Sequence, residues 1–130
     1  MRELGFSRKD RMNYSTGKPK LQEESFITFR LPRKDRDWGE KETVRVVYQP
    51  RSKDREVLGT ARIIFIEPKF FFYQPNGLFE EQVINERDAK RDGFHTSHEM
   101  YLAFVEMHGK EKCEGLFNKL SLRWIYKRKG

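Results

Sequence analysis

The sequence is poor in features that tie a chain to an oxidising compartment or to a membrane. It contains one cysteine, Cys113, which cannot form an internal disulfide. Apolar runs such as IIFI at residues 63–66 are far shorter than the roughly 20 residues that a membrane-spanning helix needs. The first residues do not have the pattern of a signal peptide. We therefore expect a cytoplasmic protein that does not enter a membrane.

The motifs of common metal and cofactor chemistry are also missing. His95, His98 and His108 do not have a zinc-ligand spacing relative to Cys113. On one helix, His98 and His108 would lie about 15 Å apart, which is too far to share a metal ion. The sequence has no Gly-rich phosphate loop, nucleophile elbow or dinucleotide-binding fingerprint. We expect neither a cofactor nor a metal.

Positive charge and aromatic side chains are what the sequence does contain. The net charge is +7, and eleven Phe, five Tyr and two Trp supply apolar area to a chain of 130 residues, enough for one domain. Bases outnumber acids in residues 30–55 and 119–129, and acids outnumber bases in residues 79–114. A basic surface favours polyanions, nucleic acid first, although the same charges also serve simply to keep a protein in solution.

The hydrophobic pattern predicts a tail followed by one domain. Residues 1–24 mix charge with Ser, Gly and Pro and have no sustained apolar period, which predicts a flexible tail before a domain at residues 25–130. Alternating apolar residues predict strands at SFITFRL, TVRVVYQ, VLGTARIIFIEP and KLSLRWIYKRK. Gly59, inside the third strand, indicates a bulge or a close backbone approach.

Two helices are predicted between the third and fourth strands. Residues 78–90 are helix-like, and a second helix begins at a capping box of Thr96 and Glu99 and stops at Gly109. This order of elements predicts an α+β fold, a mixed β-barrel with two helices packed at one end.

Thr28 and Arg30 are the first candidate ligand residues. They project from one face of the first predicted strand, about 7 Å apart. A hydroxyl beside a guanidinium can hold a phosphate, a carboxylate or the edge of a base. Two structural alternatives stay open: a solvated cross-strand pair, and an ion pair between Arg30 and Asp92.

Aromatic residues offer further candidates. The run from Phe70 to Phe72 with Tyr73 is either a core plug or a stacking surface, and burial preference favours the core. Trp38 stands in a charged loop, so we expect it to be exposed and available for stacking on a ligand. The bases that we expect to attract phosphates are Arg33, Lys34, Arg36, Lys127, Arg128 and Lys129.

The pieces FITFR, VRVVY, LGTARIIFIE, DGFHTSHEMYLAF and LSLRWIY, in this order, resemble the ASCH family. The resemblance covers about residues 25–127 and implies a PUA-like β-barrel with a cleft that accepts RNA or a nucleoside. Some similar bacterial members are amidohydrolases that act on acetylated cytidine through a lysine, a threonine and an acid. Thr28 matches the threonine and Asp92 the acid, but Ser25 stands where the lysine is expected.

Three functional hypotheses follow. The first is a non-catalytic module that binds RNA or a nucleotide through Thr28, Arg30, Asp92 and Trp38. The second is a small amidohydrolase or esterase of modified nucleosides that uses Ser25, Thr28 and Asp92; a serine hydroxyl without a base is a weak nucleophile, which argues against this mechanism. The third is an adaptor that binds a protein partner through the acidic segment 79–108. We expect a monomer.

Overall fold

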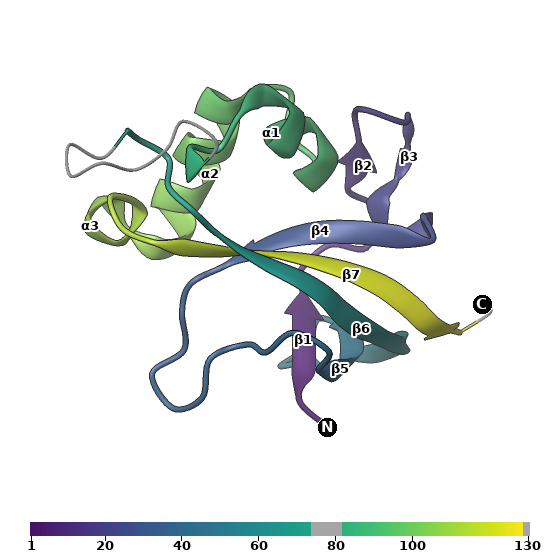
Figure 1. Cartoon of the computed structure of the whole chain (residues 1–130). Coiled ribbons are helices and arrows are strands. Elements are labelled where there is room, and N and C mark those ends of the chain that lie inside the picture. Colours follow the sequence, from purple (N-terminus) through teal and green to yellow (C-terminus); the bar gives the residue numbers. More distant parts are fainter. Residues whose placement is uncertain (74–81, 129–130) are drawn as a thin grey trace.

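The computed structural model describes residues 1–73 and 82–128, and these form an α+β fold (Figure 1). The strands are β1 (Glu3–Phe6), β2 (Met12–Asn13), β3 (Lys18–Pro19), β4 (Ser25–Arg30), β5 (Thr43–Tyr48), β6 (Glu56–Lys69) and β7 (Phe117–Lys127). The helices are the 3₁₀ helix η1 (Lys20–Gln22), α1 (Glu86–Asp92), α2 (Ser97–His108) and α3 (Lys110–Cys113). Five strands form one curled mixed sheet, a half-barrel, in the order β1-β5-β6-β7-β4, and β2 pairs with β3 separately (Figure 1).

The four strands predicted from alternating apolar residues are confirmed as β4, β5, β6 and β7. The second predicted helix is confirmed as α2, where the side chain of Thr96 accepts a hydrogen bond of 3.0 Å from the backbone N–H of Glu99. Helix α1 begins at Glu86, later than predicted, because Asn85 caps it. Part of the predicted helix 78–90 lies outside the described residues.

Residues 1–24 are not a flexible tail, and this prediction is corrected. Strand β1 pairs in parallel with β5, with Leu4 beside Val46. Leu4 is fully buried and Phe6 almost so. The apolar alternation in this segment is only one short strand long, so it is hidden among charges, yet it is enough to complete one edge of the sheet.

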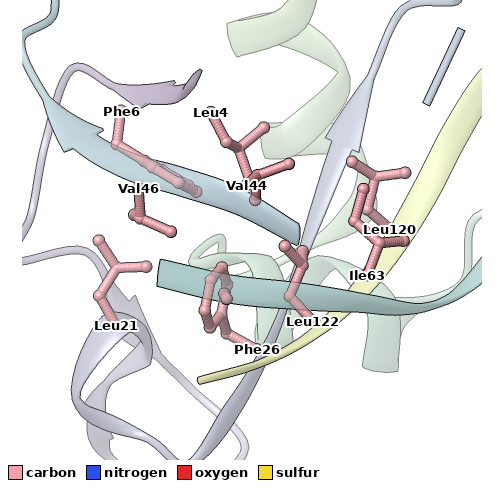
Figure 2. Packing of buried hydrophobic residues seen from close by; sticks show 10 residues of the cluster. Leu4, Phe6, Leu21, Phe26, Val44, Val46, Ile63, Leu120 and Leu122 are labelled. Carbon is pink, nitrogen blue, oxygen red and sulfur yellow. The ribbon is translucent and has the colours of Figure 1, made fainter. Parts of the chain in front are cut away.

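Two hydrophobic clusters cover the two faces of the sheet. The first fills the half-barrel, where β1, β5, β6, β7 and β4 point side chains toward one another (Figure 2); it includes Leu4, Phe6, Val46, Phe26 and Leu122. The second lies beneath the helices and includes Ile27, Phe29, Phe94, Phe104 and Phe117. Strand β4 therefore contributes to both clusters through alternate residues, as its period of two predicts.

The predicted aromatic run divides between core and surface. Phe71 packs edge-on against Phe104 and Phe117 in the second cluster, with ring centroids 5.5 and 5.4 Å away. Phe72 and Tyr73 are exposed. The core interpretation therefore holds for Phe71 and not for the end of the run.

Gly59 confirms the predicted close backbone approach. A Cβ at this position would lie 2.1 Å from the carbonyl oxygen of Tyr126, and the φ angle of 150° also disfavours a side chain. The register of β5 against β6 shifts beside it, which marks a bulge. This close approach lets β6 bend between β5 and β7.

Helix α1 is held on the sheet by buried charges. Asp88 accepts a hydrogen bond of 2.8 Å from Nζ of Lys119 on β7, and Nζ of Lys69 on β6 lies 3.7 Å from its other oxygen. All three side chains are buried. The position of α1, which carries Asp92, is thereby fixed relative to the sheet. Among the described residues, no helix is both long enough and apolar enough to cross a membrane.

Candidate functional site

A cleft of about 670 Å³ opens between the half-barrel and the helices. One wall comes from β1 and from the turn after β5, and the other from α2 and from the turn between α1 and α2. Strand β4 forms the floor through Thr28 and Arg30. The volume lies within the range of small-molecule sites, about 300–1,000 Å³.

Thr28, Arg30 and Asp92 all line this cleft, so the structure brings together three of the predicted ligand residues. Thr28 and Arg30 project from the same side of β4, and Nε of Arg30 donates a hydrogen bond of 3.1 Å to Oγ1 of Thr28. Asp92 is the last residue of α1. The early strand and the turn before α2 therefore face one hollow.

The buried partner of Asp92 is Lys20, which sequence reasoning missed. Nζ of Lys20 donates to Oδ1 of Asp92 at 2.7 Å and to the carbonyl oxygen of Ile27 at 3.0 Å. Both side chains are about 5% exposed. Burial lowers the pKa of Lys20, and the nearby Arg30 and Arg11 lower it further, while Asp92 opposes both effects. The pair joins the N-terminal segment to the end of α1.

Arg30 is held by neutral groups and not by a carboxylate. Its Nη2 donates to the carbonyl oxygen of Gly5 at 2.8 Å, and its guanidinium lies 4.7 Å from the ring centroid of Phe6. Burial lowers the pKa of Arg30 to about 10, so it stays charged at neutral pH. The proposed structural ion pair of Arg30 with Asp92 is not formed, because Asp92 pairs with Lys20.

The cleft is strongly basic. Five bases and one acid line it, and the bases are Arg8, Arg11, Lys20, Arg30 and Arg51. Arg8 and Arg51 are exposed at its rim, and Arg51 has no ion-pair partner in the described part of the chain. Such a hollow attracts anions.

Aromatic rings form the wall opposite to β1. Phe94, Phe104 and His108 line the cleft, and Arg11 lies over Phe94 at 4.4 Å from the ring centroid. Burial lowers the pKa of His108, and the charges of Lys112 and Arg30 act in the same direction. An apolar wall beside fixed cations suits a ligand with a flat ring and an anionic group.

Ser25 lies outside the cleft. It is exposed at the start of β4, opposite Arg123 of β7, and an odd spacing places it on the other face of the strand from Thr28. Lys20 reaches the floor of the cleft from η1.

Trp38 is also away from the cleft, and it is not an exposed stacking residue. It is half-buried against the first cluster. The guanidinium of Arg2 covers its ring at 4.4 Å from the centroid, and that of Arg33 lies at 5.6 Å. The loop around Trp38 folds back on the half-barrel, a contact between distant parts of the chain that local sequence does not reveal.

Of the six bases predicted to attract phosphates, the five that the structure describes do not line the cleft. Arg33 pairs with Asp35 at 3.4 Å and Arg36 with Glu42 at 3.7 Å. Nζ of Lys127 donates to the carbonyl oxygen of Gln22 at 2.8 Å. Lys34 and Arg128 are exposed, and Lys129 lies outside the described residues. The loop after β4 and the end of β7 lie at opposite ends of the view in Figure 1.

Most of the cations that line the cleft come from a segment to which the sequence pattern assigned no binding role. Arg8, Arg11 and Lys20 belong to the supposed tail, whereas Arg51, in the turn after β5, belongs to the basic segment 30–55. The alternation of Leu4 and Phe6 is the signal that could have placed that segment in the fold. Within residues 1–73 and 82–128, no three His, Cys, Asp or Glu side chains are grouped closely enough to hold a metal ion.

Comparisons with known proteins do not assign the chain to a family. No protein-family model matches it. Searches of curated proteins and of solved structures give no significant match. The functional argument therefore depends on the cleft itself.

Proposed function

We propose that this protein binds a nucleotide, free or as part of an RNA, in the cleft between the half-barrel and the helices. The observation that carries the proposal is the combination, in one hollow of about 670 Å³, of five bases with an aromatic wall. The bases supply attraction for phosphate, and His108, a half-buried ring backed by the buried rings of Phe94 and Phe104, gives a base an apolar wall to pack against.

The arrangement of charges supports a phosphate near the rim. Inside the cleft, Lys20 is already paired with Asp92 and Arg30 is bonded to Gly5. At the rim, Arg51 is exposed and has no ion-pair partner among the described residues. An unpaired arginine has its donors free for a phosphate, and little desolvation is needed to use them.

The test is calorimetric titration with AMP, GMP, CMP and UMP and with the four corresponding nucleosides. Nucleotides should bind more tightly than nucleosides, and the difference should shrink as salt is added. Arg51→Gln should weaken nucleotide binding about tenfold, or roughly 1.4 kcal/mol. Arg62→Gln is the matched control, because Arg62 is exposed on β6 and does not line the cleft.

Two results would contradict the proposal. One is the absence of binding by all four nucleotides at millimolar concentration. The other is equal weakening by Arg51→Gln and Arg62→Gln, which would mean that the net charge acts and the cleft does not.

A second candidate function is hydrolysis of a modified nucleoside such as acetylated cytidine. The observation that favours it is Lys20, which lies beside Thr28 and Asp92 on the floor of the cleft and supplies the lysine that the resemblance requires. In this reaction water adds to the amide carbonyl, the C–N bond breaks, and cytidine and acetate are released. As an ammonium group with a lowered pKa, Lys20 is suited to give a proton to the departing amine, and its partner Asp92 is a carboxylate that can accept the proton of the attacking water.

Chromatography of acetylated cytidine incubated with the protein tests this reaction. Thr28→Val should abolish product formation, and Ser25→Ala should leave it unchanged, because Ser25 lies outside the cleft. Product formation that depends on Ser25 and not on Thr28 would refute this assignment. Absence of product with micromolar protein would leave nucleotide binding as the function of the cleft.

Membership of the ASCH family, with its PUA-like barrel, remains part of this proposal. The element order β4-β5-β6-α1-α2-β7 and a cleft between a curled sheet and helices support it. The N-terminal strand β1 and the β2–β3 hairpin lie before the residues that carry the resemblance.

A further inference from the structure

A pair of stacked aromatic rings lies at the surface next to the cleft. Tyr14, in the turn between β2 and β3, stacks on His95 with ring centroids 4.0 Å apart and planes 28° from parallel. Both side chains are exposed. Neither residue lines the cleft, so the ring pair is not part of the proposed nucleotide site.

The chain connects this pair directly to the cleft. His95 follows Phe94, which forms part of the cleft wall. Arg11, at the start of the hairpin, also lines the cleft, and its Nη1 donates to the carbonyl oxygen of Gly93 at 3.0 Å. The contact is close, because a Cβ on Gly93 would lie 2.1 Å from Cγ of Arg11. The hairpin and the turn after α1 therefore form one continuous surface from the cleft to Tyr14.

Positive charge accompanies the ring pair. The backbone N–H of Tyr14 donates to the carbonyl oxygen of Lys90 at 2.9 Å, so the end of α1 lies beside the hairpin, as Figure 1 also shows. Arg87 and Lys90 are exposed on α1, and Lys18 is exposed on β3. Among the described residues, none of these three has an ion-pair partner within 4.0 Å.

We propose that a single-stranded nucleic acid with one nucleotide in the cleft continues across the β2–β3 hairpin and stacks its neighbouring base on an outer face of the Tyr14–His95 ring pair. This inference rests on the proposed nucleotide site and extends it to an oligonucleotide. Stacking of a base on an exposed aromatic residue contributes about 1–3 kcal/mol and needs no particular base. Arg87, Lys90 and Lys18 attract the phosphates on either side.

The test compares the affinity of the protein for AMP with its affinity for the tetranucleotide of adenylates. Both are measured by competition binding, with fluorescence anisotropy as the readout. Wild-type protein should bind the tetranucleotide more tightly than AMP. Tyr14→Ala should weaken binding of the tetranucleotide about 5- to 150-fold, the equivalent of losing one stacked base, and should leave AMP binding unchanged. Tyr14→Phe should keep the tighter binding, because the ring remains.

Three further variants separate stacking from charge and from folding. Tyr126→Ala removes a tyrosine that is 62% exposed on β7, outside the proposed path, and should change neither affinity. For the tetranucleotide, a plot of log affinity against log salt concentration has a negative slope. Lys90→Gln should make this slope shallower by about 0.7, the value for one phosphate of a single strand. Arg62→Gln should leave that slope unchanged.

Failure of this inference is distinguishable from failure of the nucleotide site. If AMP binds and the tetranucleotide binds no more tightly, the hairpin path is wrong and the cleft remains. If Tyr14→Ala weakens AMP and the tetranucleotide equally, the ring pair only supports the cleft wall, and the inference is overturned. If AMP itself does not bind, the nucleotide proposal fails first.

Discussion

The buried pair of Lys20 and Asp92 makes a strong prediction about stability. Asp92→Asn would leave the ammonium group of Lys20 in a buried place with Arg30 and Arg11 nearby and no carboxylate. Removing one partner of a buried ion pair costs about 3–5 kcal/mol. The cost has an upper limit, because the variant can avoid a buried unpaired charge by releasing the proton of Lys20. From an ordinary pKa of 10.5, that release costs about 4.8 kcal/mol at pH 7.

The opposite change should cost less. In Lys20→Met, burial raises the pKa of Asp92, but its carboxylate keeps the attraction of Arg30 and Arg11, which oppose that rise. We expect a loss of about 1–3 kcal/mol, on the scale of an unsatisfied buried group. The double variant Lys20→Met with Asp92→Asn should be more stable than Asp92→Asn alone, because no unpaired ammonium group remains.

The pH dependence provides an independent check. In Asp92→Asn, the pKa of Lys20 in the folded state falls further below its unfolded value. Between these two values the unfolded state binds more protons, so the free energy of unfolding rises with pH. The deficit relative to wild type should shrink by up to about 2.7 kcal/mol between pH 7 and pH 9, at about 1.4 kcal/mol per pH unit.

Urea unfolding, followed by far-ultraviolet circular dichroism, measures these differences. A loss below about 1 kcal/mol for Asp92→Asn, with no change between pH 7 and pH 9, would refute the reasoning. It would mean that water reaches Lys20 and that the pair does not hold the N-terminal segment against α1.

Three further predictions concern the core, the cleft wall and the loop around Trp38. Leu4→Ala should lower the free energy of unfolding by about 2–5 kcal/mol, because Leu4 is fully buried; a loss below 0.5 kcal/mol in urea unfolding would return β1 to the status of a tail. Burial lowers the pKa of His108, so as pH falls from about 7 to 5 the unfolded state binds a proton at this residue before the folded state does, and the free energy of unfolding falls. His108→Gln should flatten this part of the plot of unfolding free energy against pH, and an unchanged plot would contradict a buried His108. Trp38→Ala should lower the unfolding free energy by about 2 kcal/mol and leave nucleotide affinity unchanged, whereas loss of affinity in a folded variant would restore Trp38 as a ligand residue.

Strands and the capped helix could be predicted because their signals are local. Ile27 and Phe29 fall on one face of β4 and Phe26 on the other, and the two faces are buried in different clusters. Thr96 lies three residues before Glu99 and caps α2 as its spacing indicates. These are the parts of the fold in which short-range hydrogen bonds and apolar period agree.

The site could be predicted only in part, because its members meet through contacts between distant segments. Thr28 and Arg30 were found from their shared strand face, and Asp92 was found from the resemblance to the ASCH family. Lys20 was missed because its partner is 72 residues away and nothing nearby in sequence marks it for burial. Trp38 was misplaced for a related reason: a charged loop predicts exposure, while Arg2 and the half-barrel cover its ring.

Charge runs were the least reliable guide to the binding surface. The loop with Arg33 and Arg36 lies in the base-rich segment 30–55, but both arginines are paired with acids of the same loop. The cations of the cleft come from the segment between β1 and β2, from η1, from β4 and from the turn after β5. Only the folded chain brings such scattered charges together.

Amide chemical shifts during a titration with AMP are the most direct test of whether the cleft is the ligand site. If it is, the largest changes in the ¹H–¹⁵N spectrum occur at Phe6, Arg30, Phe94 and His108, which surround it. Changes confined to residues 33–38 and 127–128, with the cleft amides unmoved, would contradict a nucleotide site between the half-barrel and the helices.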